Sequence, residues 1–131
     1  MKLAIICLLL TALLPIILTW AAAYFRNKDL GFVDNQNPRK QYLLLDGIGG
    51  RMVAAQQNTW EALAVYSAAL LAIFITNVPA TAINTACLVF IISRFLFIGL
   101  YLVNQDKFRS IAFATGYGAC LYMFYLAIAS G

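Results

Sequence analysis

Apolar residues dominate four long stretches of this chain, and polar residues gather in the segments between them. The stretches cover residues 3–25, 52–76, 80–103 and 110–129, and each approaches the ~20 apolar residues that an α-helix needs to cross a bilayer. The runs are continuous and lack the alternation of barrel strands, so helices are expected. The pattern predicts an all-α integral membrane protein, a four-helix bundle in which residues 1–131 form a single domain.

The connections between the predicted helices differ in length. Residues 76–79 and 104–107 form short turns, so the last three helices should pack as antiparallel neighbours. Residues 27–50 form a long connection that contains the turn-rich segment 34–39. A loop of this length is typically functional or disordered. Two interpretations stay open: a lid over a cytoplasmic pocket, and a solvated segment that binds lipid headgroups.

Small residues follow one face of the last predicted helix. Ala112, Gly116 and Ala119 recur at helical spacing, and small side chains let a neighbouring backbone approach closely. The neighbour is either a second copy of the chain or another helix of the same bundle, and the spacing is compatible with both.

Charge predicts the orientation in the membrane. Only 11% of the residues are charged, against 63% hydrophobic, and the net charge is +4. Basic residues gather in or beside the first and third connections: Arg26, Lys28, Arg39, Lys40, Arg51, Lys107 and Arg109. The positive-inside rule then places both connections in the cytoplasm and both termini on the non-cytoplasmic side. Nucleic-acid binding is not expected, because the basic residues are split between connections and the aromatic residues lie in apolar helices.

The N-terminus also has features of a secretory signal, since Lys2 precedes an apolar run that ends in alanines at 21–23. The run is longer than the core of such a signal. Arg26 and Lys28 follow it directly and favour retention as a membrane span.

Several chemistries are excluded or disfavoured by composition. The chain has no histidine, which removes histidine general-base catalysis and histidine ligation of haem or zinc. Cys7, Cys87 and Cys120 are far apart in the sequence and lie within apolar stretches. They lack metal-ligand or redox spacing and are expected to be small buried hydrophobic residues, so no metal site is predicted.

Three polar residues interrupt the apolar stretches. Asn58 and Glu61 lie in the second stretch and Arg94 in the third, and ionisable groups at membrane depth usually pair with each other or mark a site. Glu61 lies ten residues after Arg51 and Arg94 about nine before the end of its helix, so both are roughly 14–15 Å from the cytoplasmic boundary. We expect a Glu61–Arg94 ion pair, and a polar stripe on one face of the second helix: Arg51, Ala55, Asn58 and Glu61.

Two roles are open for these residues. The pair could fix the register of the helices without any ligand. The alternative is a site for a small polyanionic molecule, which is favoured by further donors near the cytoplasmic side, namely Arg51, Arg109, Gln56 and Tyr101.

The same residues carry a resemblance to a known family. The run from Arg51 through Asn58 to Glu61, then Arg94 with Tyr101 seven residues later and Arg109 at the start of the last helix, resembles the membrane-associated proteins in eicosanoid and glutathione metabolism (MAPEG). Segment 34–39 is similar to a loop of its small bacterial members. The resemblance implies a homotrimer, in a bacterial inner membrane, that binds glutathione near the cytoplasmic face and conjugates it to lipophilic electrophiles or reduces lipid peroxides.

The resemblance also implies roles for single residues. Asn58 and Glu61 would hold the peptide and amino groups of glutathione, with Arg94 supporting Glu61. Tyr101 would line the tripeptide. Arg109 would stabilise the thiolate, and a nearby cation does lower a thiol pKa.

Three positions depart from the pattern of the glutathione-using members. Ala54 stands where they have an arginine, Ala64 where they have a proline, and Phe97 where they have a tyrosine or histidine. Loss of an arginine that binds a carboxylate would weaken binding by about 1.5–3 kcal/mol. Arg51, one turn away, could reach the same carboxylate. The alternative function is therefore a non-catalytic membrane protein of the same fold, which uses the polar stripe for packing or for anionic lipid.

Overall fold

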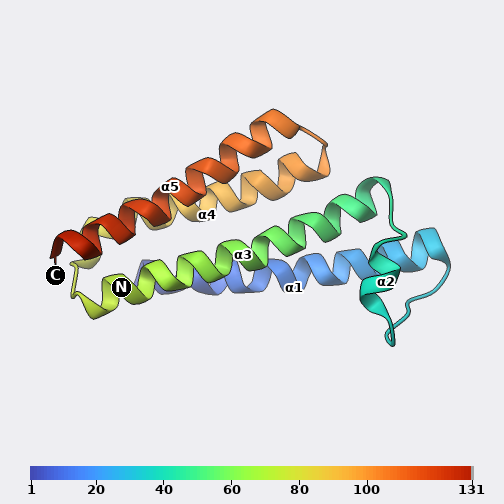
Figure 1. Cartoon of the computed structure of the whole chain (residues 1–131), viewed down its shortest axis with the longest axis horizontal. Coiled ribbons are helices and arrows are strands. Elements are labelled where there is room, and N and C mark those ends of the chain that lie inside the picture. Colours follow the sequence, from blue (N-terminus) through green and yellow to red (C-terminus); the bar gives the residue numbers. More distant parts are fainter. Residues whose placement is uncertain (131) are drawn as a thin grey trace.

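The computed structural model describes residues 1–130 and is entirely helical over its regular elements (Figure 1). The four long helices are α1 (Lys2–Leu30), α3 (Gly47–Ile75), α4 (Ala80–Leu102) and α5 (Asp106–Ser130). All four are long and apolar enough to cross a membrane, which confirms the predicted helical bundle. A short helix, α2 (Pro38–Tyr42), lies in the long connection.

The helices are longer than the predicted spans at the end of the molecule where α2 lies. α1 continues to Leu30 and α3 already begins at Gly47, so each has 29 residues, about 43 Å at 1.5 Å per residue. This length exceeds a hydrocarbon core of about 30 Å, and Arg26 and Arg51 lie on the helical extensions at the α2 end. The long connection is correspondingly shorter than expected from the sequence.

Each connection has a local cause in the sequence. Gly31 ends α1 in the left-handed conformation, with φ 81°, and its N–H donates to Asn27 O at 3.0 Å. The two tight turns use asparagine in the same region of backbone space, Asn77 with φ 55° and Asn104 with φ 60°, a conformation that asparagine tolerates better than most residues.

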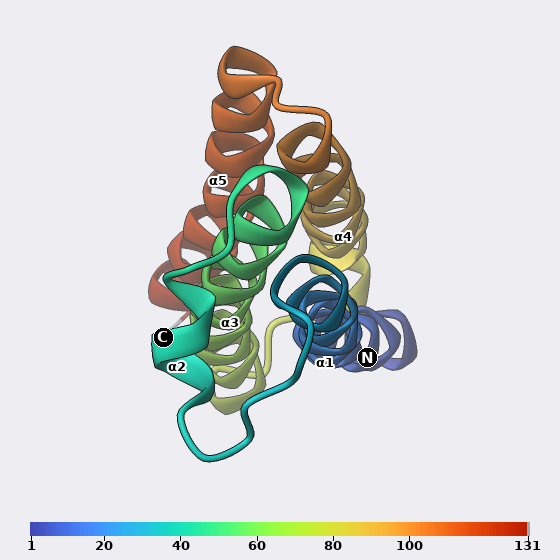
Figure 2. The same ribbon diagram turned by 90° about the vertical axis from the view of Figure 1, so that its right-hand side faces the viewer.

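Both termini lie at the end of the bundle that holds the α3–α4 turn, and α2 and the α4–α5 turn lie at the opposite end (Figure 1). The first and third connections therefore lie at the same end of the bundle. Figure 1 also shows that the α1/α3 pair and the α4/α5 pair come together toward the termini and diverge toward α2. Figure 2 shows the diverging end from the side of α2.

The main core fills the converging part of the bundle. Tyr66 of α3 and Phe90 of α4 stack at 4.1 Å between ring centroids, with both side chains buried. The Tyr66 hydroxyl donates to Ala4 O of α1 at 3.3 Å. Cys7, Cys87 and Cys120 are buried free thiols in this core, as expected. Side chains therefore fill the space between the two helix pairs in this part of the bundle.

The small residues of α5 pack inside the chain. Ala112, Gly116 and Ala119 are all buried, and a Cβ on Gly116 would lie 2.5 Å from Ser93 Oγ of α4. Between the two interpretations of this stripe, the structure selects packing of α5 on α4 within the bundle.

Candidate functional site

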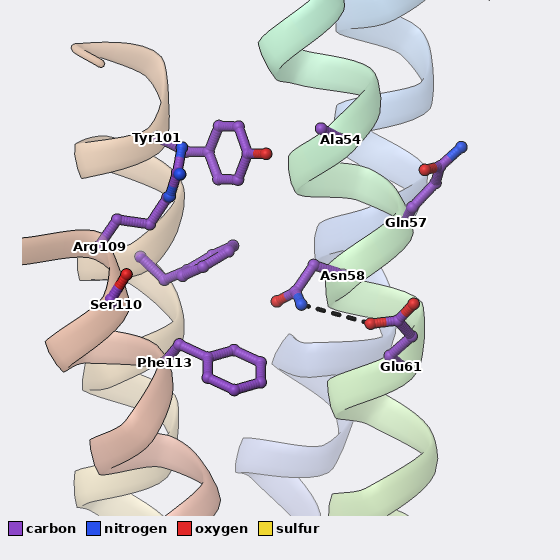
Figure 3. Close-up of a pocket in the computed structure, with 9 residues that line it drawn as sticks. Ala54, Gln57, Asn58, Glu61, Tyr101, Arg109, Ser110 and Phe113 are labelled. Atoms are coloured by element: carbon purple, nitrogen blue, oxygen red, sulfur yellow. Dashed lines mark hydrogen bonds between the residues drawn. The ribbon is translucent and has the colours of Figure 1, made fainter. Parts of the chain in front are cut away.

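A groove opens between α3 and the α4/α5 pair where the two helix pairs diverge (Figure 3). Its volume is about 380 Å³, which is within the range of small-molecule sites. We call it the α3–α5 groove, and its lining residues are Ala54, Gln57, Asn58, Glu61, Phe97, Tyr101, Arg109, Ser110 and Phe113. Four of the six site residues predicted from the sequence thus lie in one groove.

The face of α3 that lines the groove differs slightly from the predicted polar stripe. Its residues are Ala54, Gln57, Asn58 and Glu61, spaced three and four apart as on one helix face. Ala55 is fully buried against α1 instead. The rotation of α3 is therefore set by the packing of Ala55 in the core, which turns Ala54 and Gln57 toward the groove.

Arg94, Asn58 and Glu61 form a chain of hydrogen bonds. Arg94 Nη2 donates to Asn58 Oδ1 at 2.9 Å, and Asn58 Nδ2 donates to Glu61 Oε2 at 3.3 Å. Within residues 1–130 this relay replaces the direct Glu61–Arg94 ion pair expected from the sequence. The reason is helix rotation: Asn58 faces α4, whereas Glu61 is exposed on the outer side of α3.

Arg94 lies behind the wall of the groove and does not line it. The residue has no exposed surface, and its Cζ atom lies 4.3 Å from the centroid of the Phe97 ring. Its Nε and Nη1 atoms have no hydrogen-bond partner within the described chain. Since one guanidinium nitrogen bonds to Asn58, the main visible effect of Arg94 is to fix the orientation of that amide, and with it the amide's bond to Glu61.

Arg109 and Tyr101 form the opposite wall near the α4–α5 turn. The Arg109 Cζ atom lies 4.1 Å from the centroid of the Tyr101 ring, in the range of a cation–π contact. Figure 3 shows the Tyr101 ring pointing toward Ala54 across the groove, with the Arg109 side chain beside the ring. The turn at Asn104 lets α5 begin at Asp106, so Arg109 comes one turn into α5, close to the last turn of α4.

Arg51, the sixth predicted site residue, points elsewhere. Its Nε donates to Leu102 O at the C-terminal end of α4, at 3.2 Å, and it is not among the residues that line the groove. The bond satisfies a carbonyl that has no partner inside its own helix. Gln56, which the sequence also suggested as a donor, bonds to Thr19 Oγ1 of α1 at 2.6 Å.

Three residues of the groove were missed by sequence reasoning. Gln57 lies next to Asn58 and three residues after Ala54, so the helical spacing of Ala54, Asn58 and Glu61 could have identified it. Ser110 follows Arg109, and its hydroxyl donates to Asp106 O at 3.0 Å. Phe113 comes one turn after Arg109, but an aromatic residue in an apolar helix gives no signal of its own.

Four long apolar helices, with a polar groove between α3 and the α4/α5 pair, define a multi-pass α-helical membrane protein. A sequence model of the MAPEG family matches residues 3–129, nearly the whole chain, so the protein belongs to the MAPEG family. Comparisons with curated proteins and with solved structures gave no match.

Proposed function

We propose that the protein binds glutathione, or a related small thiol, in the α3–α5 groove and transfers it to lipophilic electrophiles or uses it to reduce lipid peroxides. The observation that carries this proposal is the distribution of charge along the groove, with a carboxylate (Glu61) and a guanidinium (Arg109) among its lining residues. A zwitterionic peptide with both ammonium and carboxylate groups matches such a groove better than an alkyl chain does. The family is associated with glutathione.

The proposed roles follow from position. Glu61 and Asn58 bind the amino and peptide groups of the thiol, and Arg94 orients Asn58 from behind the wall. Arg109 lies near the α4–α5 turn, where a guanidinium favours the thiolate over the thiol. Tyr101 holds Arg109 through the ring contact and lines the groove. Arg51 supports the site indirectly, because it donates to the Leu102 carbonyl at the end of α4, next to Tyr101.

The exposed position of Glu61 supports a homotrimer, as the family resemblance implies. Glu61 is exposed in the single chain, and a carboxylate facing hydrocarbon is costly. Exposed Ala64 and Ala68 follow on the same side of α3, where a second copy can approach closely. We also propose that α2 and the α4–α5 turn face the cytoplasm, by the positive-inside rule, and that the membrane is a bacterial inner membrane.

Binding is tested by thermal unfolding of the protein in detergent, with and without glutathione. Ligand at 100 times its Kd should stabilise the folded protein by roughly 2.7 kcal/mol. Absorbance near 240 nm at pH 7 should rise when glutathione is added, because bound thiol becomes thiolate. The absence of both effects for glutathione and for a panel of other small thiols would contradict the proposal.

Arg109→Gln separates the role of the cation from general effects of charge. The variant should lose the thiolate absorbance and bind glutathione about tenfold more weakly, since one charge-assisted hydrogen bond is removed. Lys107→Gln is the matched control, because Lys107 is an exposed cation two residues away that does not line the groove. Equal behaviour of the two variants would argue against a specific role for Arg109.

A second candidate function is a non-catalytic membrane protein of this fold. Ala54 favours it, because the groove has a methyl group where glutathione-using members carry an arginine. This function predicts that Glu61→Gln destabilises the assembly and that no small thiol raises the unfolding temperature of the parent protein.

A further inference from the structure

An apolar crevice follows the seam between α4 and α5. Its volume is about 400 Å³, and it is lined by α4 residues between Val89 and Leu100 and by α5 residues between Phe108 and Thr115. We call it the α4–α5 crevice. A second hollow of about 430 Å³ continues the seam toward the other end of the bundle and shares Val89 with it. Within the described chain, no residue lines both the crevice and the α3–α5 groove.

The crevice has a floor of small side chains and rims of large ones. Ser93 and Ala112 form the floor and are 3% and 7% exposed, whereas Leu96 and Ile111 form the rims and are 55% and 62% exposed. Gly116 lets α5 approach Ser93 closely, since a Cβ at this position would lie 2.5 Å from Ser93 Oγ. The crevice is therefore narrow and opens outward between two apolar ridges.

The polar groups of the crevice are already bonded within their own helices. The Ser93 hydroxyl donates to Phe90 O at 2.7 Å, and the Thr115 hydroxyl donates to Ile111 O at 2.9 Å. No charged residue lines the crevice within residues 1–130. Because neither a free hydroxyl proton nor a charge is available, a polar ligand would lose its hydration without gaining a partner. The occupant should be apolar.

The length of the crevice also restricts the occupant. Val89 and Leu100 are eleven residues apart on α4, which corresponds to roughly 16 Å along a helix. One leaflet contributes about half of a hydrocarbon core of about 30 Å. The crevice is therefore about as long as one acyl chain within one leaflet.

A further membrane helix would fit the crevice poorly. A helix with its side chains is about 10–12 Å wide, and close packing of membrane helices needs small residues where the two backbones approach. Leu96 and Ile111 would hold a helix away from the floor. The second copy proposed above contacts the α3 side of the molecule, at Glu61 and Ala64, and α3 does not line the crevice.

We infer that the α4–α5 crevice binds one unbranched acyl chain of a membrane phospholipid, in the leaflet on the side of the α4–α5 turn. An unbranched chain can reach the small floor and contact both rims, whereas methyl branches would hold it outside. The headgroup plays no part in selection by the crevice. This inference is independent of thiol binding, because Arg109 and Tyr101 do not line the crevice.

Native mass spectrometry of the full-length protein in detergent tests the inference. The protein is titrated with palmitoyl-oleoyl phosphatidylcholine, which has unbranched chains, or with diphytanoyl phosphatidylcholine, which has methyl-branched chains and the same headgroup. The unbranched lipid should reach half-maximal binding at about tenfold lower concentration, since extra methyl groups would have to be forced between the rims. Equal binding of the two lipids would overturn the inference.

The same pair of chains on phosphatidylglycerol separates chain selection from headgroup selection. The ratio between unbranched and branched lipid should be unchanged, because no charged side chain lines the crevice within the described residues. A ratio that appears with only one of the two headgroups would show that the headgroup directs binding, and the inference would fail.

Two neighbouring substitutions in α4 assign the preference to the crevice. Val89→Phe should fill part of the crevice and remove the preference for the unbranched lipid. Leu88→Phe is the matched control, because Leu88 is also an exposed apolar residue of α4 but does not line the crevice. The same result for both variants would overturn the inference. If Val89→Phe lowers the unfolding temperature, Thr115→Phe decides, since Thr115 is an exposed residue of the opposite wall.

Photolabelling in vesicles tests whether the crevice is open to lipid in the assembled protein. A phosphatidylcholine with a diazirine on an unbranched chain should label the segment that contains Leu96, and Val89→Phe should reduce this labelling. Absence of labelling there would show that protein covers the crevice, and would overturn the inference. Glutathione binding to Val89→Phe should equal that of the wild type, so the lipid and thiol proposals can fail separately.

Discussion

The α3–α5 groove and a cavity between α2 and α3, called the α2–α3 cavity here, lie on neighbouring faces of α3, but their polar groups are distributed differently. The groove is lined by the Glu61 carboxylate and, near the α4–α5 turn, by the Arg109 guanidinium. The cavity is lined by one guanidinium, that of Arg39 on α2, and by a largely apolar wall that ends at Trp60. Ala54 and Gln57 line both. The difference shows how one helix can present two chemically different faces: what lies opposite α3, the α4/α5 pair or α2, decides which side chains each face meets.

The supports of the two sites also differ. Behind the groove, Arg94 is fully buried in the middle of the bundle and holds Asn58 through one hydrogen bond. Behind the cavity, Gln41 and Arg26 are buried at the end of the bundle and hold α2 through several. Substitution of Arg94 should therefore change both the groove and the stability of the whole bundle. Substitutions that break the Gln41 hydrogen bonds should change only the position of α2.

The largest effect is expected from Arg94. Arg94→Ala removes a fully buried side chain and leaves Asn58 without its partner, so the free energy of unfolding in detergent should fall by about 3–5 kcal/mol. Arg94→Met keeps much of the volume and removes the buried charge, so it should recover most of the stability. Glutathione affinity, measured by thermal-shift titration, should stay low in both. Wild-type affinity in Arg94→Met would show that Arg94 does not organise the groove.

A smaller effect, of opposite sign, is expected from Ala54→Arg. The new guanidinium would project from the wall that the groove and the cavity share. A carboxylate anchor worth about 1.5–3 kcal/mol should tighten glutathione binding by about 10- to 100-fold. Ala54→Gln, which adds length without charge, is the control, and an equal gain for it would exclude an ionic cause.

The smallest effect concerns Asp34, in the segment before α2, and its dependence on pH. The backbone N–H of Asn37, followed by that of Gln36, donates to the Asp34 carboxylate and holds its pKa below the ordinary value. The carboxylate form therefore stabilises the folded state above the unfolded pKa of about 3.9, and this contribution disappears as pH falls through the lower folded pKa.

Asp34→Ala tests this prediction. It should lower the unfolding temperature slightly near neutral pH, and the difference from the wild type should vanish on acidification below the folded pKa. Asp29→Ala is the control, because Asp29 is an exposed acidic residue nearby at the end of α1. A difference that persists at the lowest pH would show that Asp34 acts through packing and not through its charge.

Much of the candidate site could be predicted because it depends on local periodicity and connection length. Short turns force α3, α4 and α5 to be antiparallel, so Asn58 and Arg94 had to lie at similar depths, and Tyr101 and Arg109 had to meet at the α4–α5 turn. The predicted partner of Arg94 was wrong by one helical turn, because Asn58 and not Glu61 accepts its hydrogen bond. Counting residues from the helix ends gives the depth of a side chain only to about one turn. It does not give the rotation of a helix about its axis.

Arg51 also shows that residue spacing alone does not predict the partner of a side chain. It lies seven residues before Asn58 and so appeared to share its face, yet its guanidinium bonds to the end of α4. A long side chain near a helix end can reach several groups, and the unpaired carbonyl of Leu102 was not visible in the sequence.

The sequence by itself determined the four apolar helices, their antiparallel order and the membrane class, because the bilayer requires long apolar helices and short turns leave no other path for the chain. It also determined which polar side chains must avoid lipid. Only the tertiary structure decided which of them meet. The burial of Ala55 and the close contact of Gly116 with Ser93 set the helix rotations, and the divergence of the two helix pairs toward α2 leaves room for the α3–α5 groove. These depend on packing between segments far apart in the chain, which the pattern along the chain does not record.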